Sequence, residues 1–169
     1  LMTNILEKII EEKKHSLDLI KKEKSLDILE KNIKEQSFLN FKETIQKNRS
    51  VSLITEIKKA SPSAGVLVNN FDHLEIAKMY VNNGATCLSV LTEEKHFLGK
   101  LDYIQDIKKQ IKVPILAKDF FIDPYQIALS KSYGCDCILI IIAALNGAQA
   151  DEIYSEALKH NLSVIVEVH

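Results

Sequence analysis

The chain has 169 residues, enough for one sizeable core, and its hydrophobic fraction of 46% and charged fraction of 27% are those of an ordinary globular protein. The formal net charge is -1, so no overall electrostatic field favours nucleic acid or an anionic membrane as a partner. Three cysteines without a CxxC pair, and the lack of a long apolar run, predict a cytoplasmic protein without a targeting segment. Cys135 and Cys137 could bind a metal in principle, but we interpret them as small apolar residues that enter a strand, and we predict no metal site.

Residues 1–49 differ in pattern from the rest of the chain. Apolar residues recur there at steps of three and four among lysines and glutamates, which predicts two or three amphipathic helices. A further short helix is expected to start at Ser37. Acidic residues alternate with the lysines, so we expect a helical extension that packs on the main domain and not a helix that lies on an anionic membrane.

Residues 50–169 repeat a strand, a loop and a helix in units of about 25 residues. Asp72 is a plausible N-cap of a helix that ends at Gly84, and Asp123 with the proline that follows it starts a helix that ends at Gly134. Two more helices are expected, one through Ile104 and Ile107 and one that ends near residue 161. The predicted strands are 52–58, 87–92, 114–118, 137–142 and 163–167.

Alternating strands and helices with short connections predict a parallel sheet, which either stays open and doubly wound or forms part of a (β/α)8 barrel. No glycine-rich phosphate fingerprint follows the first strand, and charged residues at the ends of several strands favour the barrel. A barrel needs eight strands and typically about 250 residues. We therefore expect an α/β protein whose residues 50–169 form about five βα units of a (β/α)8 TIM barrel.

Four charges stand at the carboxyl ends of these strands, where active sites of parallel α/β proteins are built: Glu56, Lys58, Lys118 and Glu167. Glu56 and Lys58 are two residues apart and so project from the same face. A barrel would place all four charges inward, where a lysine and a glutamate facing each other could act as general acid and base. Salt bridges that merely fill the barrel mouth are the structural alternative.

Four motifs follow one another along this part of the chain. They are Glu56-Ile-Lys-Lys-Ala-Ser-Pro-Ser63, Leu88-Ser-Val-Leu-Thr-Glu93 with Phe97 and Gly99, Leu116-Ala-Lys-Asp-Phe-Phe-Ile-Asp123 with Tyr125-Gln126, and Val166-Glu-Val-His169. This ordered set resembles the indole-3-glycerol-phosphate synthase family, and the helical extension resembles the family's N-terminal segment. The resemblance implies a (β/α)8 enzyme of tryptophan biosynthesis, a carboxy-lyase without metal or organic cofactor. Its small phosphorylated substrate would be 1-(2-carboxyphenylamino)-1-deoxyribulose 5-phosphate, which loses carbon dioxide and water as the indole ring closes.

The resemblance also implies a role for each matching residue. Lys118 matches the general acid of ring closure, and Glu167 matches the base of the dehydration step. Lys58 matches a lysine that contacts substrate and has also been assigned an acid role, and Glu56 the carboxylate that orients it. Three further residues match substrate-binding positions, a serine near the substrate carboxylate and two aromatic residues that wall the anthranilate ring: Ser61, Phe97 and Phe120.

Two departures from the family pattern limit these expectations. The family has a lysine where this chain has Ala64, and the family continues past residue 169 with strands whose loops bind the substrate phosphate. We therefore expect residues 1–169 alone to be catalytically deficient, and to self-associate through unpaired sheet edges. The alternatives are another phosphate-sugar barrel enzyme of the phosphoribosylanthranilate isomerase type, which would need a Cys/Asp pair, and a non-catalytic truncated fragment.

Overall fold

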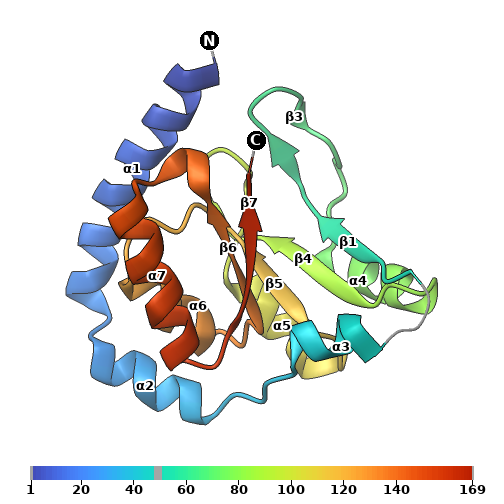
Figure 1. The fold of residues 1–169 in the computed structure, drawn as a ribbon. Coiled ribbons are helices and arrows are strands. Elements are labelled where there is room, and N and C mark those ends of the chain that lie inside the picture. Colours follow the sequence, from blue (N-terminus) through green and yellow to red (C-terminus); the bar gives the residue numbers. More distant parts are fainter. Residues whose placement is uncertain (1, 48–50, 169) are drawn as a thin grey trace.

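The computed structural model describes residues 2–47 and 51–168 and begins with three helices, as predicted (Figure 1). They are α1 (Met2–Glu23), α2 (Leu26–Lys34) and α3 (Phe41–Lys47). The prediction that the last helix starts at Ser37 was wrong, because the Asn40 side chain accepts the Glu43 N–H at 2.9 Å and so caps the helix there. The predicted domain boundary after residue 49 falls within residues 48–50, outside the described part of the chain.

Five parallel strands form the main sheet in the order β1-β4-β5-β6-β7. Their ends lie within two residues of the predicted ones, and Lys58 comes one residue after its strand. The bounds are β1 (Ile54–Ile57), β4 (Cys87–Leu91), β5 (Ile115–Lys118), β6 (Cys137–Ile141) and β7 (Ser163–Glu167). This order, in which each strand pairs with the next across a helical crossover, is that of consecutive units of a (β/α)8 barrel.

A small hairpin projects from the loop after β1, where the sequence predicted only a loop (Figure 1). Its strands β2 (Ala60–Ser61) and β3 (Gly65–Val66) pair antiparallel. A strand of two residues is too short to show the alternation of polar and apolar side chains by which strands are recognised. The hairpin rises beyond the carboxyl end of β1 and so borders the edge of the sheet where the charged residues were predicted to lie.

Four α-helices and one turn of 3-10 helix connect the strands. Asp72 caps its helix as predicted, since its Oδ1 accepts the N–H groups of Leu74 and Glu75 at 2.9 and 3.1 Å. Asp123 likewise accepts the Tyr125 N–H at 2.9 Å, and Gly134 follows the end of that helix with φ +98°. The bounds are α4 (His73–Asn82), α5 (Asp102–Gln110), α6 (Tyr125–Ser132), the 3-10 turn (Ile142–Ala144) and α7 (Gly147–Lys159).

Two apolar layers lie on opposite faces of the sheet. On the outer face, side chains such as Ile57 and Val90 pack with the helices that connect the strands. On the inner face, Phe41 of α3 is buried against Leu116 and against residues of β4 and β6. Alternation along the strands then places Lys118, two residues after Leu116, on the inner face at the carboxyl end, as the sequence predicted.

The first two helices form a second layer over α6 (Figure 1). Leu17 of α1 and Leu29 of α2 are buried in one cluster with Tyr125, Ala128 and Leu129 of α6. A helix with one apolar stripe is stabilised mainly by such packing and not by its own backbone hydrogen bonds. The cluster therefore fixes where α1 runs, and it brings the polar face of α1 beside the loops at the carboxyl end of the sheet.

Candidate active site at the carboxyl end of the sheet

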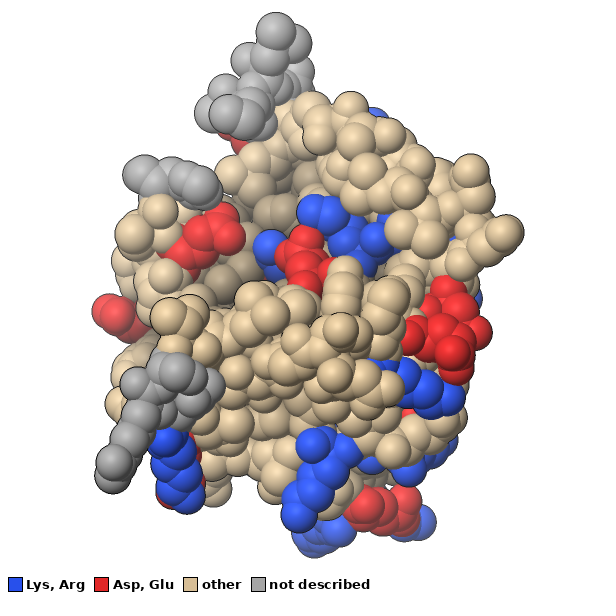
Figure 2. All heavy atoms as spheres, turned by 90° about the vertical axis from the view of Figure 1, so that its right-hand side faces the viewer, with Lys and Arg blue, Asp and Glu red and all other residues tan. Residues whose placement is uncertain are grey.

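Acidic and basic side chains meet in a hollow on the face that Figure 2 shows, beside the projecting hairpin of Figure 1. Three of the predicted residues come together at the carboxyl ends of β1 and β5. Lys118 Nζ lies 2.7 Å from Glu56 Oε2, and Lys58 Nζ lies 2.8 Å from Glu56 Oε1. One carboxylate therefore holds two ammonium groups, one on each oxygen. All three side chains are about one-third exposed, so the cluster is open to a ligand.

The Glu56 carboxylate is ionised at neutral pH. Burial raises its pKa, but hydrogen bonds from Lys118 and Lys58, together with their charges, outweigh burial and bring the pKa below its usual value. A carboxylate with a lowered pKa is a poor proton donor at neutral pH. The geometry therefore suits Glu56 to orienting both lysines, whereas the family resemblance implied that it orients Lys58 alone.

Glu167 is the last residue of β7 and lies opposite Ile141 of β6. β6 stands between it and β5, the strand of Lys118. Ile165, two residues earlier, packs on the inner apolar cluster, so alternation places Glu167 on the same face as Lys118. The strands therefore bring Glu167 and Lys118 to the same carboxyl end of the sheet. The role of Glu167 as a base remains a prediction. His169, the last residue of the fourth motif, lies outside the described residues.

The two predicted aromatic residues lie together. The ring centroids of Phe97 and Phe120 are 6.3 Å apart with 43° between the ring planes, a favourable tilted arrangement. The rings come from the loops after β4 and β5, and both are half-buried. Gly99, in the same motif as Phe97, is explained by close packing, because a Cβ there would lie 2.2 Å from the Leu91 carbonyl oxygen.

Ser61 lies in the hairpin that follows β1. Its Oγ accepts the Ala64 N–H at 3.3 Å, a contact that stabilises the turn. The turn contact does not exclude a second role, since a hydroxyl has two acceptor sites and one donor. The substrate contact expected for Ser61 stays a prediction.

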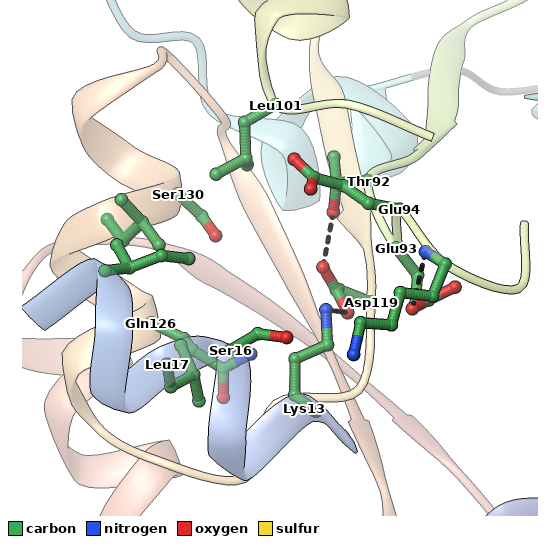
Figure 3. Close-up of a pocket in the computed structure, with 13 residues that line it drawn as sticks. Lys13, Ser16, Leu17, Thr92, Glu93, Glu94, Leu101, Asp119, Gln126 and Ser130 are labelled. Carbon is green, nitrogen blue, oxygen red and sulfur yellow. Dashed lines mark hydrogen bonds and ion pairs between the residues drawn. The ribbon is translucent and has the colours of Figure 1, made fainter. Parts of the chain in front are cut away.

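Several charged residues beside the site gave no signal in the sequence. Lys13 of α1 forms an ion pair of 2.7 Å with Asp119, the residue after Lys118 (Figure 3). Glu12 Oε2 lies 2.8 Å from His96 Nε2 in the loop that carries Phe97. Lys13 and Asp119 line a cavity of about 80 Å³ between α1, α6 and the loops after β4 and β5. Periodicity assigns Glu12 and Lys13 only to a polar helix face, and a polar face is normally solvated.

The three cysteines lie away from the charged cluster. Cys87 and Cys137 are the first residues of β4 and β6, at the amino ends, and Cys135 is also buried. Burial raises the pKa of Cys87 to about 11 and that of Cys137 to about 12, so neither is a reactive thiolate. The isomerase alternative needs a Cys/Asp acid–base pair, and in the described residues these cysteines lie at the opposite end of the sheet.

Residues 2–47 and 51–168 contain neither a metal-binding cluster nor a membrane-spanning helix. No group of three or more His, Cys, Asp or Glu side chains in these ranges has an arrangement that could hold a metal ion. None of the helices in the same ranges combines the length and the apolar content that crossing a bilayer requires.

The strand order and the charged carboxyl ends define the chain as part of a (β/α)8-type fold. A solved structure of 3-hexulose-6-phosphate synthase supports this fold class, with a TM-score of 0.54 over 70% of this chain and 53% of that chain. The sequence identity is 18%, so the likeness concerns the fold alone.

The family follows from sequence comparison. A family model of indole-3-glycerol phosphate synthase matches residues 6–169, so the chain belongs to that family. Proteins of that name are 42% identical over 98% of this chain in Aliarcobacter butzleri, and 54% identical over 69% of it in Azospirillum brasilense. The Legionella pneumophila (strain Lens) protein is 42% identical over 99% of this chain. The chain spans 64%, 45% and 65% of these three relatives, respectively.

Proposed function

We propose that this chain supplies the acid–base part of an indole-3-glycerol phosphate synthase. The reaction closes the pyrrole ring of 1-(2-carboxyphenylamino)-1-deoxyribulose 5-phosphate and releases carbon dioxide and water. The observation that carries the proposal is the cluster in which Glu56 holds Lys58 and Lys118 at the carboxyl end of the sheet. The family membership of residues 6–169 supports it independently.

In the first step, an aromatic carbon of the substrate attacks the ketone carbon, and the ketone oxygen becomes an alkoxide. Lys118 is the acid that protonates this oxygen, because its ammonium group is held by Glu56 at the inner face of the sheet. The ring carbon that forms the new bond then loses its carboxyl group as carbon dioxide. The pair of Phe97 and Phe120 would hold the aromatic ring against the ketone and exclude water.

In the second step, the new hydroxyl leaves as water, and the neighbouring carbon of the new five-membered ring loses a proton, which completes the aromatic pyrrole ring. Lys58, whose Nζ lies 2.8 Å from Glu56 Oε1, would contact the substrate and donate the proton for the leaving hydroxyl. Glu167, which ends β7 at the same edge of the sheet, would accept the proton that is lost. Ser61 would contact the substrate carboxylate before decarboxylation.

The test uses a chimaera in which residues 1–168 are followed by the later barrel strands expected for the family, taken from the Aliarcobacter butzleri relative, of which this chain spans 64%. The chimaera is expected to form indole-3-glycerol phosphate. Lys118→Ala should lower kcat by about 10² to 10⁴-fold, the usual contribution of a general acid. Lys112→Ala, which removes an exposed lysine before β5, is the matched control and should leave kcat unchanged. A folded chimaera without turnover, or a Lys118→Ala variant that keeps full kcat, would contradict the proposal.

Residues 1–169 by themselves should show no turnover in the same assay. The described strands form one sheet of five strands, whereas a closed barrel needs eight, and barrel enzymes commonly bind phosphate with the loops after the last strands. Turnover by the chain alone at the rate of the chimaera would show that the five strands suffice.

A further inference from the structure

The N-terminal helix contacts both loops that carry the aromatic pair. Glu12 and Lys13 are consecutive residues of α1, and each forms an ion pair with a different loop at the carboxyl end of the sheet. Glu12 reaches His96 in the β4–α5 loop (residues 92–101), and Lys13 reaches Asp119 in the β5–α6 loop (residues 119–124). The loops carry Phe97 and Phe120, respectively, so one turn of α1 connects the segments that form the proposed ring pocket.

The ion pair between Lys13 and Asp119 is nearly buried, and Asp119 has further hydrogen-bond donors. The side chains of Lys13 and Asp119 are 13% and 10% exposed, which limits screening of the ion pair by water and salt. Asp119 Oδ2 also accepts a hydrogen bond from the Thr92 hydroxyl at 3.0 Å (Figure 3). Its Oδ1 accepts the Phe120 N–H at 2.8 Å. Asp119 therefore joins α1 and the end of β4 to the backbone of Phe120, one residue beyond Lys118.

The loop that carries Phe97 is built around a second buried carboxylate. Glu93 is 3% exposed, and its two carboxylate oxygens accept the N–H groups of Lys95, His96 and Phe97 at 3.1, 2.7 and 3.0 Å. The Glu93 carboxylate thus holds the backbone of residues 95–97, and the Glu93 carbonyl oxygen also accepts the Gly99 N–H at 2.8 Å. The contact between Glu12 and His96 then fixes this loop relative to α1.

From these contacts we propose that Lys13 is a positioning residue for the proposed reaction. Lys13 acts through Asp119 and so sets the separation of the Phe97 and Phe120 rings. The inference rests on the proposed function, in which those rings hold the anthranilate part of the substrate. Loss of the Lys13 charge leaves Asp119 as a nearly buried carboxylate that, within the described residues, keeps two neutral donors, the Thr92 hydroxyl and the Phe120 N–H. The β5–α6 loop then moves toward water, and Phe120 moves with it.

The kinetic test uses the chimaera described above, at a temperature where every variant is fully folded. Lys13→Met should raise the KM for 1-(2-carboxyphenylamino)-1-deoxyribulose 5-phosphate by about tenfold and change kcat by less than about threefold, because it affects binding of the ring and not proton transfer. Lys13→Arg keeps the charge and should restore most of the affinity. Lys14→Met removes an exposed neighbouring lysine on the same helix and should leave KM unchanged.

A merely structural role of Lys13 predicts a different result. Lys13→Met would then lower the temperature of unfolding while the KM of the folded enzyme stayed at its original value, and that result would overturn the inference.

A double variant distinguishes the two cases further. Adding Lys13→Met to Asp119→Asn should raise KM no more than Asp119→Asn alone, since Lys13 is argued to act only through Asp119. Additive effects would overturn the inference, and Lys13→Gln replaces Lys13→Met if the latter does not fold.

A second measurement on residues 1–169 themselves separates this inference from the proposed function. Contacts between the ring protons of Phe97 and Phe120 can be followed by NMR, because their centroids are 6.3 Å apart. Lys13→Met should weaken this contact and Lys14→Met should preserve it. If the chimaera is inactive but the ring contact depends on Lys13, the proposed function fails and the positioning role stands. If the contact persists in Lys13→Met, the positioning role fails whatever the activity.

Discussion

At the scale of single residues, the site depends on one carboxylate that is shared by two lysines. Each oxygen of Glu56 accepts a hydrogen bond from one ammonium group, at 2.7 Å for Lys118 and 2.8 Å for Lys58. Such charge-assisted hydrogen bonds are short and about twice as strong as neutral ones. Removal of Glu56 would leave two positive charges side by side, so the carboxylate contributes to folding as well as to the orientation of the lysines.

The lowered pKa of Glu56 predicts a specific dependence of stability on pH. A carboxyl group whose pKa is lower in the folded state stabilises the fold above its unfolded pKa, here 4.5, and loses this contribution as the pH falls through the folded value. Glu56→Gln should therefore lower the free energy of unfolding by about 2 kcal/mol at pH 7. The difference between wild type and Glu56→Gln should shrink below pH 4.5.

Urea unfolding at a series of pH values from 7 to 3 measures this difference. Glu152→Gln removes an exposed carboxylate of α7 and serves as the control, with little change expected at any pH. A loss in Glu56→Gln that stays constant down to pH 3 would mean that the Glu56 carboxylate is not stabilised by the lysines.

At the scale of secondary-structure elements, a buried carboxylate at the amino end of the sheet connects the N-terminal helices to the strands. Asp136, just before β6, accepts the Leu39 N–H at 2.6 Å and the Ile115 N–H at 2.8 Å. Lys108 of α5 donates to both of its oxygens, at 3.0 and 2.8 Å. One side chain thus ties the segment between α2 and α3 to the start of β5 and to α5. This contact determines where α3 lies and hence how Phe41 covers the inner face.

Asp136→Asn tests this connection. The Asp136 side chain is 0% exposed and that of Lys108 is 7% exposed, so the substitution leaves a buried ammonium group without its counter-charge. We expect the free energy of unfolding to fall by about 3 to 5 kcal/mol, measured as a lower urea midpoint. Asp151→Asn, at an exposed position of α7, is the control. Adding Lys108→Met should recover part of the loss, because it removes the unpaired charge, and a double variant as unstable as the single one would contradict this explanation.

At the scale of the whole molecule, the sheet of the described residues has an edge at β1 and another at β7. Exposed apolar side chains accompany both edges. Leu53 and Ile54 are 48% and 38% exposed beside β1, and Val166 and Val168 are 50% and 71% exposed at β7. An edge strand with apolar side chains is a template for pairing with another chain. The helices cover the outer face but leave these two edges uncovered (Figure 1).

We therefore predict that residues 1–169 self-associate through these edges. Sedimentation velocity should show an average mass that rises with protein concentration, and Val166→Lys combined with Leu53→Lys should shift the distribution toward the monomer. Leu19→Lys, at a position of α1 that is 51% exposed and away from the edges, is the matched control and should have no effect. A monomer at all concentrations, or an equal effect of Leu19→Lys, would contradict edge pairing.

The sequence by itself determined the order and nearly the bounds of the five strands. It also placed Glu56, Lys58 and Lys118 at the carboxyl end of the sheet. These features follow from local rules, since alternation along a strand, the Asp72 cap and the position of Gly134 each depend on a few neighbouring residues. These local rules did not predict the hairpin of residues 60–66 or the start of α3. Two-residue strands carry no period, and the start of α3 depends on Asn40 and on the distant Asp136.

Only the tertiary structure decided which charges distant in the sequence meet. The partners Glu56 and Lys118 are 62 positions apart, and Glu12 and His96 are 84 positions apart. No periodic pattern encodes such pairs, because each depends on the packing of helices and strands that bring distant segments together. The packing of α1 on α6 turned two ordinary residues of a polar helix face, Glu12 and Lys13, into contacts of the candidate site.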